Sequence, residues 1–160
     1  YHCYTDQKQK EYDLMQRIIN LAAFDNGYSD DIRHKAVTLI YKITRYGNDR
    51  LVTEIIHEYQ LLLTLRVILE KNDERDEAAM DTVTCAVHNC VVTDEYCLFS
   101  YDVLVPMVKV LGDEKYKNCE ESVISAVNAV RENIPNSKLY DLVMNYPLVE
   151  TVVGYMKVKQ

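Results

Sequence analysis

The feature that most constrains this chain is an apolar segment that recurs along it at nearly constant spacing. Residues 61–69 (LLLTLRVIL) return 43 residues later as residues 104–112 (LVPMVKVLG), and 44 residues after that as residues 148–156 (LVETVVGYM). A fainter copy, residues 14–22 (LMQRIINLA), precedes them at an offset of 47 residues. Repeats of this length build architectures in which each unit buries its apolar face against its neighbours. The period therefore predicts a stack of similar units.

A polar break and a longer amphipathic stretch follow each copy of the apolar segment. In the stretch after the first copy, apolar side chains fall at Ile32, Ala36, Ile40 and Ile43, which is helical spacing. Similar stretches follow the second and third copies. A shorter segment then closes each unit, at residues 49–59, 94–101 and 137–146. The predicted unit is a short helix, a middle helix and a long helix.

The apolar copies are rich in valine and leucine, so they are also compatible with the buried strands of an α/β protein. Pro106 in the third copy argues against a central strand, where proline removes a hydrogen-bond donor, and suits the first turn of a helix. The chain has four glycines and three prolines, too few for a turn-rich β-sandwich or barrel. We therefore predict an all-α fold.

Residues that favour helix ends stand where the long helices are expected to begin and end. Asp30 or Asp31 can accept the first amide hydrogens of the first long helix. Asn118 with Glu121 has the spacing of a capping box for the third long helix. Gly47 stands where the first long helix is expected to end.

Length and charge restrict the class of protein. The 160 residues, of which 48% are apolar, suffice for one domain with a continuous core. A net charge of −7 argues against a nucleic-acid surface, and charged residues interrupt every apolar run before it reaches the length of a membrane span. We expect neither a nucleic-acid nor a membrane partner. We expect an intracellular, cytoplasmic or nuclear protein, of which this chain, beginning at Tyr1, is a piece.

The cysteines form an odd set of five without the spacing of a disulfide framework: Cys3, Cys85, Cys90, Cys97 and Cys119. Cys85, His88, Cys90 and Cys97 could supply four metal ligands, but they include no CxxC pair, and Cys90 lies far around a helix from Cys85. We predict reduced, mostly buried thiols and no metal or other cofactor. A nucleophilic Cys85 with His88 as its base remains the enzymatic alternative.

The remaining charged clusters and histidines are interpreted as solvent-exposed surface. Residues 70–81 (EKNDERDEAAMD) hold six acidic residues, which favour the positive end of a helix dipole and indicate a solvated helix start. His34 and His57 stand beside charged neighbours and are expected to be plain surface residues.

A unit of about 42 residues with an apolar middle helix reading LVxxLVxLL and a long third helix reading AxxALxNI is the armadillo pattern. This chain resembles it over nearly its whole length, most clearly at residues 104–111 (LVPMVKVL) and 86–91 (AVHNCV). The resemblance implies one domain, residues 1–160, forming a right-handed α-solenoid of about three armadillo-like units. The units span roughly residues 14–46, 49–91, 94–133 and 137–158.

In the armadillo family the long third helices line a concave groove that binds extended peptides. The resemblance therefore implies a non-catalytic scaffold that binds a partner protein or peptide. Asn89 matches an asparagine that, in several family members, bonds the backbone of the bound peptide. Helical spacing places nine candidate partner-binding residues on this face: Thr38, Lys42, Arg45, Asp81, Cys85, Asn89, Ser125, Asn128 and Glu132.

The signs of the charges differ along the candidate face. Lys42 and Arg45 in the first unit are positive, whereas Asp81 and Glu132 in the later units are negative. A bound segment is therefore expected to be acidic toward one end and basic toward the other.

An assembly element is the alternative from another class of function. Its end helices, at residues 14–23 and 147–159, would then stack on further repeats or on a second copy of the chain. Uncovered middle helices leave apolar surface that favours such self-association.

Overall fold

The computed structural model describes residues 2–23, 27–71, 77–111, 113–138 and 141. Over these residues the regular structure is helical throughout and contains no strand, which confirms the all-α prediction. The helices, in chain order, are α1 (His2–Ala22), α2 (Asp30–Tyr46), α3 (Asp49–His57), α4 (Leu61–Lys71), α5 (Glu77–Thr93), α6 (Cys97–Ser100), α7 (Leu104–Leu111), the 3-10 helix η1 (Glu114–Cys119) and α8 (Glu120–Asn133).

The second and third apolar copies, which could also have formed buried strands, are the helices α4 and α7. Pro106 lies in the first turn of α7, where its missing N–H has no partner to lose. The first copy is the end of α1, which begins at His2 and is therefore much longer than its apolar segment. The fourth copy, residues 148–156, lies outside the described residues.

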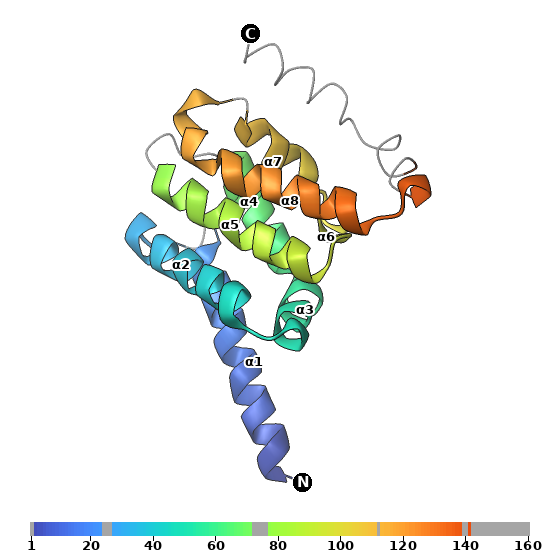
Figure 1. Ribbon diagram of the computed structural model, residues 1–160. Helices are drawn as coiled ribbons and strands as arrows, with labels where there is room; N and C mark the ends of the chain where they lie inside the picture. Colours follow the sequence, from blue (N-terminus) through green and yellow to red (C-terminus); the bar gives the residue numbers. More distant parts are fainter. Residues whose placement is uncertain (1, 24–26, 72–76, 112, 139–140, 142–160) are drawn as a thin grey trace.

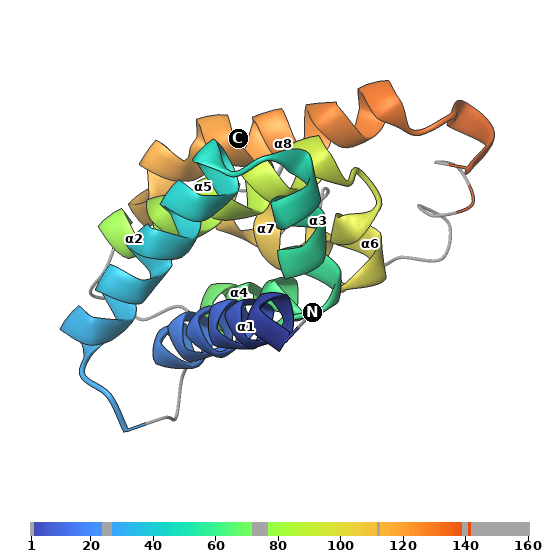
Figure 2. The same ribbon diagram turned by 90° about the horizontal axis from the view of Figure 1, so that it is seen from below.

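The helices pack in two layers (Figures 1 and 2). The long helices α2, α5 and α8 lie side by side in one layer, with α5 in the middle. Behind them α1, α4 and α7 form the second layer, and α4 contacts both α1 and α7. The short helices α3 and α6 lie at one edge of both layers. The order short, middle, long along the chain thus places each kind of helix in its own part of the structure.

The first long helix begins with a cap that the sequence analysis assigned to the wrong residue. Ser29, not Asp30 or Asp31, is the N-cap of α2, and its hydroxyl accepts a hydrogen bond from the backbone N–H of Ile32. The two aspartates lie in the first turn instead, where carboxylates are stabilised by the helix dipole. Gly47 ends this helix as expected, and a Cβ there would lie 2.6 Å from the carbonyl oxygen of Ile43.

The third long helix does not have Asn118 as its N-cap. Asn118 lies inside η1, and α8 begins directly after this 3-10 helix at Glu120, with Cys119 as an N-cap whose side chain makes no capping hydrogen bond. The cap belongs to η1, where the carboxylate of Asp113 accepts from the N–H of Lys115. A capping box requires an extended residue at the N-cap, and Cys119 is already helical.

Two turns with the same unusual backbone lead into the middle helices. Gln60 precedes α4 with a φ of 51°, and Asp102 stands shortly before α7 with a φ of 55°. Both residues are in the left-handed region, which costs a non-glycine residue on the order of 1 kcal/mol. Both connections from a short helix to a middle helix thus contain a left-handed residue, directly before α4 in the first and two residues before α7 in the second.

The core predicts which substitutions unfold the protein. Leu65 in α4 is fully buried, so Leu65→Ala should lower the free energy of unfolding by about 2 to 5 kcal/mol, because it leaves a cavity. Urea denaturation followed by circular dichroism measures the change. Thr53→Ala on the exposed side of α3 is the control and should stay within about 0.5 kcal/mol of the parent. Equal effects of the two substitutions would contradict the placement of α4 in the core.

Candidate functional site

The nine residues predicted to bind a partner lie on the three neighbouring long helices, and none of them is buried. On each helix they alternate with the residues that pack into the core, so they lie on the outward side of the layer. We call this surface the long-helix face; its members are Thr38, Lys42 and Arg45 on α2, Asp81, Cys85 and Asn89 on α5, and Ser125, Asn128 and Glu132 on α8.

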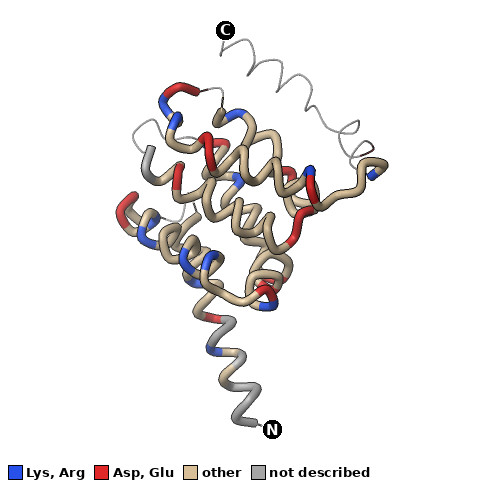
Figure 3. The backbone as a smooth tube through the Cα atoms, viewed as in Figure 1, with Lys and Arg blue, Asp and Glu red and all other residues tan. Residues whose placement is uncertain are grey.

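The α2 end of the long-helix face is basic (Figure 3). The guanidinium carbon of Arg45 lies 5.8 Å from the ring centre of Tyr41 and 5.6 Å from that of Tyr46. Nη1 of Arg45 also donates a hydrogen bond to the Tyr41 hydroxyl. Cation–π contacts of this kind hold the guanidinium in place without neutralising its charge. Lys42 is exposed beside it, so this end offers two cations.

The centre of the face, on α5, carries one charged side chain, Asp81. The thiol of Cys85 faces Asp81, with 3.9 Å between Sγ and Oδ1. Partial burial, and then the Asp81 charge, raise the pKa of Cys85, so the sulfur is held as a thiol. Burial lowers the pKa of His88, which favours the neutral imidazole. An activated cysteine has its pKa lowered by a neighbouring base or cation, and Cys85 lacks this property.

Asn89 has a structural contact that the sequence analysis did not foresee. Its side-chain amide Nδ2 donates to the hydroxyl of Thr44 on α2, at 3.2 Å. Thr44 is buried and donates in turn to the carbonyl oxygen of Tyr41. An asparagine amide has two N–H donors and one acceptor oxygen, so this contact uses one of its donors. Asn89 therefore joins α5 to α2 at the edge of the face.

A second polar contact joins α5 to α8. The hydroxyl of Ser122 lies 2.7 Å from that of Thr84, and both residues are buried. The Thr84 hydroxyl donates to the backbone carbonyl oxygen of Asp81. The Ser122 hydroxyl lies 3.0 Å from the backbone carbonyl oxygen of Cys119. A hydrogen-bonded pair between described residues thus lies on each side of α5, Asn89 with Thr44 and Thr84 with Ser122.

The α8 end of the face is acidic overall. Asn128 and Glu132 are exposed, and Ser125 is partly buried. Glu132 lies near Arg131, with 3.9 Å between the charged atoms, but both side chains are largely exposed and such a pair contributes little. From α2 to α8 the face therefore passes from basic to acidic, with Asp81 at its centre already negative.

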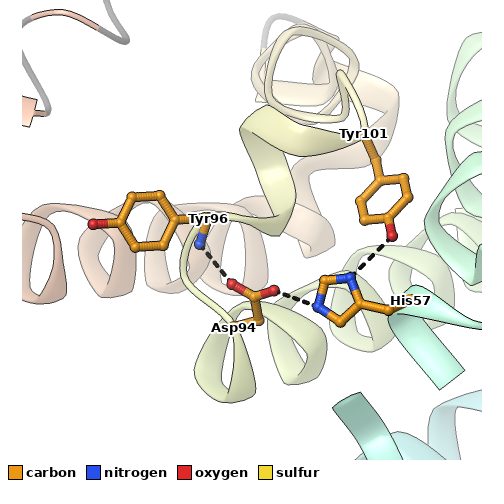
Figure 4. A network of polar contacts seen from close by, with 4 residues as sticks. All are labelled: His57, Asp94, Tyr96 and Tyr101. Carbon is orange, nitrogen blue, oxygen red and sulfur yellow. Dashed lines mark hydrogen bonds and ion pairs between the residues drawn. The ribbon is translucent and has the colours of Figure 1, made fainter. Parts of the chain in front are cut away.

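A network around His57 lies away from this face (Figure 4). Nε2 of His57, at the end of α3, lies 2.8 Å from a carboxylate oxygen of Asp94 in the turn after α5. Nδ1 lies 3.1 Å from the hydroxyl of Tyr101, which follows α6. The other oxygen of Asp94 accepts from the backbone N–H of Tyr96. His57 is at the surface, as expected, but it bridges two consecutive units, which spacing along the chain did not reveal.

The hydroxyl, imidazole and carboxylate of this network have the order of a nucleophile, a base and an orienting acid. Partial burial, and then the charge of Asp94, raise the pKa of Tyr101, which keeps its phenol protonated. A nucleophilic tyrosine needs the opposite shift. The network therefore acts as a structural bridge between α3 and the α5–α6 turn.

The described cysteines are free thiols: Cys85 is partly buried, and Cys90, Cys97 and Cys119 are buried. This agrees with the expected burial in apolar helix faces. Within the described part of the chain, no group of three or more histidine, cysteine, aspartate or glutamate side chains is arranged to hold a metal ion.

Comparisons with protein-family models, with curated proteins and with solved structures find no match to this chain. Among the described residues, no helix combines the length and the apolar character needed to cross a membrane.

Burial predicts an order of thiol reactivity. Burial, and then the Asp94 charge, raise the pKa of Cys90 to about 12, and burial raises that of Cys97 well above the ordinary value. In the native protein iodoacetamide should modify Cys85 well before Cys90, Cys97 or Cys119, because alkylation requires an accessible thiolate. Mass spectrometry of digested time points measures each site. Native modification of Cys97 at the rate of Cys85 would contradict the burial described above.

His88 predicts a pH dependence of stability. Its pKa is lowered below the usual 6.5 in the folded chain, so the unfolded chain binds this proton first as the pH falls. Stability is therefore lost from about pH 6.5 downward, until the folded imidazole is protonated as well. We expect His88→Gln to reduce the loss of unfolding free energy between about pH 7 and about pH 5, measured by urea denaturation. An imidazole signal titrating at or above the usual value in NMR would show this reasoning to be wrong.

Proposed function

We propose that this chain is a non-catalytic interaction module that binds an extended segment of a partner protein along the long-helix face. We further propose that its units are armadillo-like and wind as a right-handed solenoid. The observation that carries the proposal is the arrangement of charge across three adjacent helices, with Lys42 and Arg45 on α2, and the negative Asp81 on α5 and Glu132 on α8. An extended surface of this kind suits a peptide or protein better than a small molecule.

The chemistry of the face supports binding over catalysis. Its central thiol is protonated beside Asp81, and the imidazole of His88 is neutral and partly buried. A half-buried asparagine and uncharged side chains can instead satisfy the N–H and C=O groups of an extended backbone. The basic and acidic ends then set the direction of the bound segment, with its acidic part over α2 and its basic part over α8.

The charge arrangement predicts which peptides bind and which substitutions weaken them. The test is a peptide array of extended segments with acidic and basic ends in both orders, followed by fluorescence anisotropy on the strongest binder. Charge reversal by Lys42→Glu with Arg45→Glu should slow association and reduce its salt dependence, because exposed charges act mainly on encounter. Asn128→Ala should weaken binding by about 1 to 3 kcal/mol if its amide pairs with the bound backbone.

Two controls separate recognition from folding. Asn89→Ala is expected to weaken binding by a similar amount, but it also removes the contact with Thr44, so its unfolding free energy is measured in parallel. Thr53→Glu changes an exposed residue of α3, away from the long helices, and should leave affinity unchanged. If the changes on α2 and α8 leave the affinity of the selected peptide untouched, the long-helix face is not the binding surface.

A further inference from the structure

The two outer long helices expose the sides that α5 uses to pack against its neighbours. On α5, Asn89 bonds to α2, and Thr84 bonds to α8, so these two residues mark the two packed sides. Residues of α2 correspond to those of α5 at the repeat offset of 47, which pairs Leu39 with Ala86. Ala86 is fully buried, whereas Leu39 is 43% exposed. The side of α2 that faces away from α5 is therefore an uncovered copy of a surface that is packed inside the layer.

At the opposite end of the layer, α8 exposes the side that corresponds to the side of α5 packed against α8. Residues of α5 correspond to those of α8 at an offset of 43, which pairs Thr84 with Val127. Thr84 is fully buried, whereas Val127 is 36% exposed and its neighbour Ile124 is 45% exposed. Within the described part of the chain, the side of α8 that faces away from α5 thus also has exposed apolar side chains.

The internal contact fixes how these two halves would meet. Thr84 of α5 lies opposite Ser122 of α8, and the positions equivalent to Ser122 in the two earlier units are Ala79 and Ile32. Val127, the equivalent of Thr84, would accordingly lie opposite Ile32 of another α2. Ile32 is 38% exposed, so the contact pairs two uncovered apolar side chains.

The ion pair near this contact is internal to α2, where Lys35 lies 2.7 Å from Asp31. The pairing therefore rests on the exposed apolar side chains of Ile32 and Val127 and on its equivalence to the internal contact between α5 and α8.

We propose that a second copy of this chain packs its α2 against α8 of the first, continuing the long-helix layer from one molecule into the next. The contact is head to tail, so the two partners use different surfaces and the assembly stays open at both ends. This interaction uses the sides of the layer and not its outward face, and it holds or fails independently of the partner binding proposed above.

Sedimentation equilibrium over a series of protein concentrations tests the proposal. The weight-average mass of the parent chain should rise with concentration above the monomer value of 18.6 kDa and continue past the dimer. Ile32→Asp and Val127→Asp should each remove this rise, because each places a carboxylate in the apolar contact. Aspartate in the first turn of α2 is favourable for the helix, and circular dichroism checks that both variants are folded.

Mixing the two variants gives the sharpest result. Ile32→Asp keeps an intact α8 surface and Val127→Asp keeps an intact α2 surface, so an equimolar mixture should form a dimer that grows no further. Thr53→Asp on α3 is the matched control and should associate like the parent chain. A monomeric parent at all concentrations overturns the proposal. Loss of association in one variant alone also overturns it, because that pattern shows one surface pairing with itself.

Discussion

The fold depends on the burial of α5 from two sides. Val83, Ala86, Val87 and Cys90 are fully buried, because α2 packs on one flank of this helix, α8 on the other and the middle helices behind. Burial of apolar surface contributes roughly 25 cal/mol per Å², so a helix covered on three sides sets the positions of its neighbours. The outer helices α2 and α8 are thereby held at a defined separation, with α5 between them.

Apolar burial has no preferred direction, so it does not by itself fix how far one helix slides along another. Two hydrogen-bonded contacts beside α5, one between hydroxyls and one from an amide to a hydroxyl, fix the position of each helix along its neighbour. Thr84 with Ser122 and Asn89 with Thr44 join helices that are distant in the sequence, and each contact is satisfied only in one register. The spacing between the basic and the acidic end of the long-helix face follows from these contacts.

The helices were predictable from the sequence because they depend on apolar periodicity, which is local and repeated three times. The exact residues at which the helices begin and end were harder to predict from the sequence. Ser29 and Asp30 are both good capping residues, and only the backbone angle of Ser29 decides between them. The bridge from His57 to Asp94 joins residues 37 positions apart, and no spacing rule connects such a pair.

The candidate face was predicted as a set of positions, and the structure adds what each side chain touches. The sequence placed Asn89 on a helix surface, but its contact with Thr44 depends on the packing of α5 against α2. The raised pKa of Cys85 likewise depends on partial burial and on the distance to Asp81. Neither property follows from residue type and helical spacing alone.

The left-handed turns at Gln60 and Asp102 have a consequence for how the chain tolerates insertions and deletions. Each turn joins a short helix to a middle helix through three residues, 58–60 and 101–103, one of which is left-handed. One added residue would put a different residue into the left-handed position and change the direction in which the chain enters the following helix. Related chains can therefore vary in length in the polar breaks before the long helices, but at these two turns the number of residues is fixed by the direction in which α4 and α7 must face.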